Sequence, residues 1–244
     1  YMSKKFFKLN NTTKTLGKIF PALLICTPAV AFSAIIDQST SVPQDFSADA
    51  EYVINQDVTI SSADSEAAVS VSGFKVNNAT NNGNISGTGN GLNINTGVQS
   101  VVINNGIGAT ISSTTANAVN IKSLRGDFNN SGSIIGAENG MFVSKGSSAL
   151  NITNTSNGMI KGKTGLSTQA GIGINNYGSI IGTNGDAITA DYGNTKVINS
   201  CTVQGTDNGI SSKDTANLDI LNSGTISGET NAIMFASSAS TRNS

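Results

Sequence analysis

The chain contains no histidine and no tryptophan, and only 12% of its 244 residues are charged. Nucleophilic catalysis by Ser-His-Asp or Cys-His groups needs an imidazole, so the composition excludes both arrangements. Arginine occurs only at Arg125 and Arg242. Charged residues are fewer than in a typical soluble domain, and the uncharged residues Gly and Asn are abundant in their place. This composition favours a structural or binding protein over an enzyme.

Cysteine is scarce as well. Cys26 lies in the apolar segment near the N-terminus, and Cys201 is the only other cysteine. A disulfide framework is therefore excluded for the rest of the chain. The segment Asn199-Ser200-Cys201 aligns with Asn222-Ser223-Gly224 of a later repeat, which makes Cys201 a turn residue rather than a nucleophile.

The N-terminal segment has the pattern of a secretory signal peptide. Five of the 14 basic residues precede the mostly apolar stretch 19–32, which ends in small residues. Ala29-Val30-Ala31 and Ala31-Phe32-Ser33 both fit a cleavage site, so we assign residues 1–33 to the signal. The alternative, a transmembrane anchor, is disfavoured because the stretch is short and contains two prolines.

Removal of the signal changes the charge balance. Nine basic residues then face 15 acidic ones, a net charge of about −6. Proteins that bind nucleic acid need Lys and Arg against the phosphates, so we expect no nucleic-acid partner. Residues 34–50 are expected to form a polar connector.

A phrase of the form Asn-x-Gly-x-Ile-x-Gly recurs along the remaining chain. It occupies residues 81–87, 130–136, 176–182 and 222–228, and looser copies centre on Ile60, Ile111, Ile160 and Val203. The central residues lie 20 to 26 positions apart, a period that indicates a solenoid. We place the repeats at 51–235 and a tail without pattern at 236–244.

Within each repeat, apolar residues alternate in short runs, which is typical of β-strands, and no segment has helical spacing. Gly and Asn between the runs supply turns, because both tolerate positive φ. One coil of three short strands cannot bury its own apolar face, whereas stacked coils bury it and pair their backbones. We therefore predict an all-β fold, a single-stranded parallel β-helix of about seven to eight coils.

The asparagine that precedes the glycine of each phrase is expected to form a ladder of stacked side-chain amides. The members of the predicted ladder are Asn81, Asn130, Asn176, Asn199 and Asn222. The phrase is thus interpreted as architecture, with Asn for the ladder, Gly for the corners and Ile for the core.

A Lys-rich leader followed by Asn-x-Gly-x-Ile-x-Gly phrases and Asn-Gly-Ile or Asn-Ala-Ile runs resembles the passenger region of bacterial autotransporters, the type V secretion family. The resemblance covers essentially the whole chain. It implies export to the periplasm, passage through an outer-membrane translocator barrel and display on the cell surface. It also implies a right-handed coil, as the crossover rule for parallel strands does. The barrel has no counterpart in this sequence, so we expect the tail to continue in a longer protein or the translocator to be separate.

The acidic residues of the repeats are scattered rather than paired. A glycosidase needs two carboxyl groups that face each other across a defined gap. Asp186 and Asp191 are the pair that could approach each other near a corner, and solvated turn residues are the simpler interpretation. The Gly-rich calcium-binding nonapeptide is also absent. We expect no catalytic residue, metal site or cofactor.

The tripeptide Arg125-Gly126-Asp127 is the one specific candidate for a binding motif, because it resembles the integrin-recognition sequence of some adhesins. The alignment of the tripeptide with a later repeat argues against integrin-type binding. Gly126 and Phe128 align with the inward-pointing Leu218 and Ile220, so Arg125 and Asp127 are expected to flank a strand rather than lie on a mobile loop.

These observations predict a monomeric, surface-displayed or secreted passenger that acts as an adhesin or host-interaction rod on a Gram-negative bacterium. Its partner would be a host cell or matrix surface. Two alternatives remain open. One is a carbohydrate-active β-helix enzyme, either a lyase or a hydrolase. The other is a structural stalk for a functional region farther along the protein.

Overall fold

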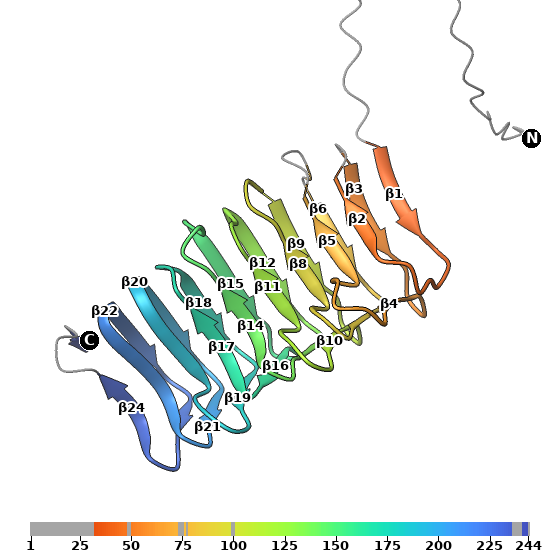
Figure 1. The fold of residues 1–244 in the computed structure, drawn as a ribbon. Coiled ribbons are helices and arrows are strands. Elements are labelled where there is room, and N and C mark those ends of the chain that lie inside the picture. Colours follow the sequence, from red (N-terminus) through yellow and green to blue (C-terminus); the bar gives the residue numbers. More distant parts are fainter. Residues whose placement is uncertain are drawn as a thin grey trace, which may run out of the picture. The chain divides into compact units, whose positions relative to one another are not determined.

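A computed structural model describes residues 32–47, 50–72, 76, 78–98, 101–235 and 241–243. This part of the chain is a parallel β-solenoid of about eight turns without any helix, as the sequence predicts (Figure 1). The predicted signal peptide lies outside the described residues, apart from Phe32 and Ser33. The right-handed sense of the coil stays a prediction.

A complete turn contributes one short strand to each of three faces, and the first turn reaches the second face only through an isolated bridge between Thr40 and Ile60. The first face contains β1 (Phe32–Ile36), β3 (Ala50–Ile54), β6 (Asn78–Asn81), β9 (Val101–Asn105), β12 (Gly126–Asn130), β15 (Leu150–Asn154) and β18 (Gly173–Asn176). It continues in the second halves of β20 (Ile188–Asn199) and β22 (Asn208–Asn222) and in β25 (Thr241–Asn243).

The second face is an eight-stranded parallel sheet. Its strands are β4 (Thr59–Ser62), β7 (Asn84–Gly87), β10 (Thr110–Ser113), β13 (Ser133–Ile135), β16 (Met159–Gly162), β19 (Ser179–Gly182), β21 (Thr202–Gly205) and β23 (Thr225–Ser227).

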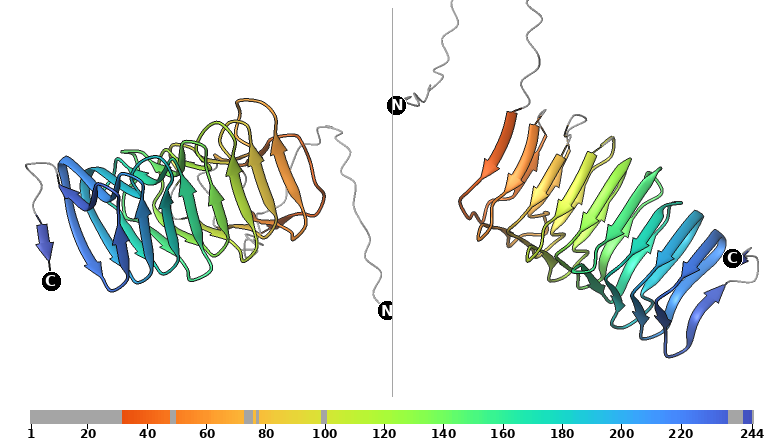
Figure 2. Two further views of the ribbon diagram at one scale, coloured as in Figure 1. Left: turned by 90° about the horizontal axis from the view of Figure 1, so that it is seen from below. Right: turned by 180° about the vertical axis from the view of Figure 1, so that it is seen from behind.

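The third face returns the chain to the first. It contains β2 (Gln44–Phe46), β5 (Val69–Val71), β8 (Leu92–Ile94), β11 (Val119–Ile121), β14 (Asn139–Val143), β17 (Thr164–Thr168), the first halves of β20 and β22, and β24 (Asn231–Phe235). In β20 and β22 the third and first faces merge into one strand, with a register shift between Ala190 and Tyr192. Figure 2 shows the successive strands side by side from two further directions.

The central apolar residues of the eight repeats stack in one column inside the second face, as predicted. The column runs through Ile60, Ile85, Ile111, Ile134, Ile160, Ile180, Val203 and Ile226. All but Ile226 are buried, and Ile226 packs against the core from the last described turn. Full burial of such a side chain stabilises the fold by about 1.5–3 kcal/mol.

The solenoid begins earlier than the sequence indicates. The expected connector at 34–50 holds most of β1 and all of β2, and β1 pairs in parallel with β3 from Phe32↔Ala50 to Ile36↔Ile54. Ala34 and Ile36 pack against the core. This turn contains neither the Asn nor the Gly of the phrase, which is why its repeat character is not visible in the sequence.

The glycines of the phrase are needed for close packing between turns rather than for positive φ. A Cβ on Gly178 would lie 2.2 Å from the carbonyl oxygen of Gly158 and 2.4 Å from that of Thr155. Gly83, Gly132 and Gly224 would meet a backbone oxygen of the preceding turn at the same 2.2 Å. Among the described glycines, positive φ occurs elsewhere, for example at Gly108 and Gly126. The expectation of left-handed corner residues was wrong for these phrase glycines.

Candidate functional site

A ladder of seven asparagines, all buried except the last, runs along the end of the first-face strands. Each Nδ2 donates to the Oδ1 of the next turn at 2.7 to 2.9 Å, through Asn81, Asn105, Asn130, Asn154, Asn176, Asn199 and Asn222. The five predicted members are all present. Asn105 and Asn154 also belong to the ladder. They were not predicted, because the residues that follow them differ from the repeated phrase. In the first two turns the same inward position is taken by Ile36 and Ile54.

The ladder also satisfies the corner backbone. Asn176 Nδ2 donates to the carbonyl oxygens of Gly178 and Thr202 at 3.1 and 3.0 Å. Asn130 Oδ1 accepts from the backbone N–H of Gly132 at 3.3 Å. Buried polar groups require such partners, so the ladder is a structural element whose amides are fully used.

Amide rows on the outer surface run in the opposite direction. Asn129 donates to Asn104, Asn104 to Asn78, and Asn78 to the carboxylate of Glu51, at 3.0, 3.0 and 2.8 Å. Each donation goes to the preceding turn. The row therefore ends on a side chain that accepts hydrogen bonds but does not donate them.

Two further acids end rows in the same way. Asn231 donates to Asn208 and Asn208 to Asp186, each at 2.8 Å. Asp186 also accepts from the backbone N–H of Asn208 at 2.9 Å and from the hydroxyls of Thr189 and Ser211. Asn151 donates to Asp127 at 3.2 Å. Glu51, Asp127 and Asp186 are scattered in the sequence, and each accepts a hydrogen bond that connects two neighbouring turns.

The structure keeps Asp186 and Asp191 apart. Asp186 precedes the third-face segment of β20, whereas Asp191 follows that segment and pairs with the Lys213 ammonium at 2.9 Å. Five residues of extended chain separate the two carboxyl groups by on the order of 15 Å. No cluster of three or more potential metal ligands occurs among the described residues.

Arg125, Gly126 and Asp127 lie where the chain enters β12. Arg125 and Asp127 are exposed, and Phe128 is fully buried in register with Ile152. Arg125 Nε donates to Ser148 Oγ of the next turn at 2.9 Å. Gly126 has φ +129°, and a Cβ there would lie 2.2 Å from the carbonyl oxygen of Val101. Only Arg125 flanks the strand, whereas Gly126 and Asp127 are its first two residues, and both charged side chains are held by the following turn rather than placed on a mobile loop.

Cys201 occupies the position of the phrase glycines, as predicted. Its carbonyl oxygen accepts from the N–H of Thr225, just as the carbonyl of Gly178 accepts from Thr202. The thiol is half-buried, free of any disulfide and 3.9 Å from the Thr202 hydroxyl. No imidazole exists anywhere in the chain to activate it.

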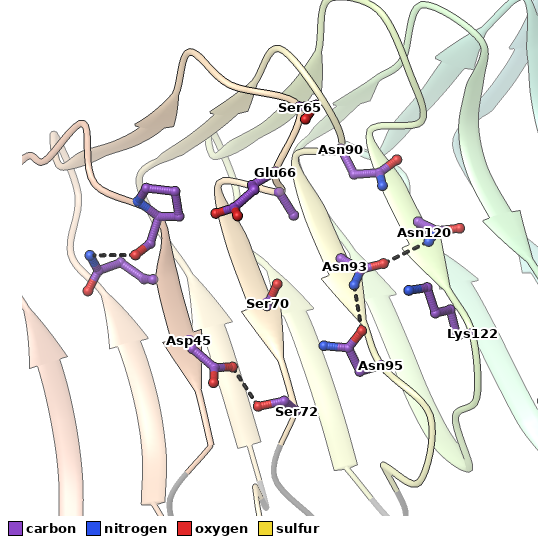
Figure 3. Close-up of a pocket in the computed structure, with 13 residues that line it drawn as sticks. Asp45, Ser65, Glu66, Ser70, Ser72, Asn90, Asn93, Asn95, Asn120 and Lys122 are labelled. Carbon is purple, nitrogen blue, oxygen red and sulfur yellow. Dashed lines mark hydrogen bonds between the residues drawn. The ribbon is translucent and has the colours of Figure 1, made fainter.

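A polar groove of about 570 Å³ lies on the outer surface of the third face (Figure 3). Outward side chains at alternate positions of β5, β8 and β11 and of their ends form its floor, with Asp45 of β2 at one end. Its charged and amide-bearing lining residues are Gln44, Asp45, Glu66, Asn90, Asn93, Asn95, Asn120 and Lys122.

Hydrogen bonds across the groove fix several of these side chains, as the dashed lines in Figure 3 show. Asn120 Nδ2 donates to Asn93 Oδ1 at 2.7 Å, and Asn93 Nδ2 donates to Asn95 Oδ1 at 2.7 Å. Ser72 Oγ donates to Asp45 Oδ1 at 2.6 Å. The sequence analysis did not identify this groove, because its residues come from successive turns and only the strand register brings them together.

A second, smaller depression of about 390 Å³ lies over the ends of β19, β21 and β23. Glu229 is the only ionisable residue in its lining, and its other polar side chains are Thr183, Gln204, Thr206 and Ser227. It offers fewer directed side chains than the groove on the third face.

Comparison with known proteins gives no relative for this chain. The sequence matches no protein-family model and no curated protein, and the fold matches no solved structure at a significant level. Within the described residues there is no helix of a length and apolarity that would cross a membrane.

Proposed function

We propose that this protein is an exported, surface-displayed passenger whose solenoid acts as an adhesin. The resemblance of the leader and the repeats to autotransporter passengers supports the export route. The polar groove of the third face is the observation that favours binding over a purely structural stalk. Its side chains are directed outward, and several of them are not used to hold the turns together.

The distribution of the other polar groups supports this proposal. The buried asparagine ladder stabilises the first face, and Glu51, Asp127 and Asp186 end outer amide rows. Groups engaged in this way are poorly placed to bind a partner. The groove brings amides, hydroxyls and three charged residues together on one face of the first turns.

The test is attachment by the purified chain from Phe32 to Ser244, which keeps every described strand. Fluorescently labelled protein is titrated onto cultured host epithelial cells and onto surfaces coated with matrix proteins. Saturable binding that unlabelled protein displaces is expected. Inertness on all surfaces would contradict adhesion and support a stalk.

A carbohydrate-active enzyme is the second candidate, and one observation favours it. Asp45 and Glu66 both line the groove, and a pair of carboxyl groups is what glycoside hydrolysis requires. Asp45 already accepts a hydrogen bond from Ser72. Incubation with neutral and uronic-acid polysaccharides, followed by assays for reducing ends and unsaturated products, distinguishes this candidate from an adhesin.

A further inference from the structure

We infer that the third-face groove binds a neutral, extended glycan chain that lies along the solenoid axis, across successive turns, with Phe142 as a stacking platform at one end. This inference rests on the proposed adhesive function and names the chemical class of its ligand. It is built on one outward-facing row of side chains.

The row is defined by strand register. Asp45, Ser70, Asn93, Asn120 and Phe142 stand at equivalent positions of β2, β5, β8, β11 and β14. Parallel neighbouring strands lie about 4.8 Å apart, so the row extends for about 19 Å. This spacing is close to the length of one pyranose ring in an extended chain. A glycan laid across the strands would therefore present one sugar to each turn.

The lining offers both donors and acceptors at fixed positions, as hydroxyl-rich ligands require. Asn93 is only 8% exposed, and its amide is bonded on both sides, which makes it a rigid part of the floor. In the described part of the chain, the side chains of Glu66, Ser70 and Lys122 have no hydrogen-bond partner. They are free to bind sugar hydroxyls, which donate and accept alike.

Asn90 supplies an independent indication of an absent ligand group. Its Oδ1 is buried and has no hydrogen-bond partner, although the residue lines the groove. A buried acceptor without a donor is unfavourable, and native structures satisfy nearly all such atoms. In Figure 3 the Asn90 side chain lies at the same edge of the groove as Ser65. Rotation of the Asn90 amide toward the groove would let a sugar hydroxyl supply this donor.

The charge of the groove selects among glycans. Asp45 and Glu66 carry negative charges and Lys122 a positive one, which leaves the lining with a net charge of −1. Sulfated or uronic-acid chains would bring further negative charge against the two carboxylates. Repulsion of this kind discriminates strongly at close range. The inference is therefore restricted to neutral chains.

Phe142 interrupts the polar row directly beyond Asn120, the last residue of the row that lines the groove. Met141 and Val143 on either side of it are fully buried, so the Phe142 ring points outward, and it is half-buried. Its register neighbours Asn120 and Ser167 are polar. A phenyl ring at this position presents an apolar face to solvent in line with the groove. The C–H face of a sugar ring is the complement of such a surface.

The experiment is isothermal titration of the purified 32–244 chain with cellopentaose, cellobiose and a sulfated heparin pentasaccharide. Cellopentaose is expected to bind, cellobiose to bind more weakly because it reaches fewer turns, and the heparin fragment not to bind. Phe142→Ser should weaken cellopentaose binding about tenfold. Ser70→Arg, which fills the groove without removing a core contact, should abolish it. Tyr177→Ser removes another exposed aromatic, outside the groove, and should leave binding unchanged.

The outcomes separate this inference from the proposed function when cell attachment is measured with the same variants. Parallel loss of glycan binding and attachment supports both. If cellopentaose does not bind but attachment persists in Ser70→Arg, the glycan site is overturned and adhesion stands. If the heparin fragment binds as tightly as cellopentaose, the restriction to neutral chains is overturned. Circular dichroism of each variant verifies that the solenoid is intact.

Discussion

Asn154 and Asn176 are joined by a hydrogen bond of 2.8 Å between Nδ2 of the first and Oδ1 of the second, one turn apart. Asn154 Oδ1 in turn accepts from Asn130 at 2.8 Å. Both side chains are fully buried, so each amide depends on the neighbouring turns for its partners. The loss of one ladder amide is therefore expected to lower the stability of the neighbouring turns as well.

This coupling predicts that Asn154→Ala is strongly destabilising. The substitution removes the ladder acceptor of Asn130 Nδ2, which keeps only the carbonyl oxygen of Met159, and it leaves the buried Asn176 Oδ1 without a donor. Unsatisfied buried groups cost about 1–3 kcal/mol each, so we expect a loss of about 2–4 kcal/mol. Urea denaturation followed by circular dichroism measures it.

Asn222→Ala is the matched control. Asn222 ends the described ladder, is exposed, and accepts from Asn199 at 2.8 Å. Water can replace its hydrogen bonds, so the expected loss is about 0.5–1 kcal/mol. Equal losses in the two variants would show that the interior ladder contributes no more than a surface amide.

The repeat pattern predicted the fold because each of the eight repeats places an Ile or Val at the same inward position. The column from Ile60 to Ile226 follows directly from the spacing of the phrase. The ladder could be predicted wherever glycine follows two residues after asparagine, as at Asn176 and Gly178. It was missed at Asn154, because the glycine of that corner, Gly158, lies four residues on.

The groove could not be predicted in the same way. Ser70, Asn93 and Asn120 are ordinary surface residues in the sequence, and no motif connects them. They become neighbours only because the intervals between turns fix the register of β5, β8 and β11. The binding surface of a solenoid depends on residues that do not repeat, and sequence periodicity gives no information about those.

Close approach between turns predicts that Gly178→Ala destabilises the fold. Its Cβ would lie within 2.4 Å of two backbone oxygens, neither of which can rotate away. Separation of the turns would stretch the ladder at Asn176. We expect a loss of about 3 kcal/mol, at the upper end for overpacking, measured by thermal unfolding.

Gly185→Ala serves as the comparison for Gly178→Ala. At Gly185 the nearest atom to an added Cβ is the carbonyl oxygen of Lys163 at 3.4 Å, an ordinary contact. Its effect should stay within about 0.5 kcal/mol. If Gly178→Ala were equally mild, the tight packing of this corner would be refuted.

The position of β1 predicts the site of signal cleavage. Phe32 is the first residue of β1 and pairs with Ala50 of β3. Cleavage after Ala31 would leave this strand whole, whereas cleavage after Ser33 would remove its first two residues. Intact mass spectrometry of the exported protein should therefore find Phe32 at the N-terminus. A product that begins at Ala34 would show that the pairing of Phe32 and Ser33 is dispensable.

The contacts of Arg125 and Asp127 predict that the tripeptide is not the attachment site. Arg125 is bonded to Ser148, Asp127 to Asn151, and Gly126 is the first residue of β12. These bonds fix the Arg125 guanidinium and the Asp127 carboxylate against the next turn, so neither side chain has the freedom that it would have on a mobile loop. Asp127→Glu should therefore leave cell attachment of the purified chain unchanged within about twofold, since surface substitutions away from a binding site have small effects.

Asp219→Glu is the matched control, because Asp219 stands in the same outward column of the first face through Asn151, Gly173 and Lys196. A carboxylate lengthened by one methylene at either position alters the same surface. Loss of attachment in Asp127→Glu alone would establish the tripeptide as a receptor contact. The Asp127 carboxylate would then bind the receptor through the acceptor capacity that its bond to Asn151 leaves unused.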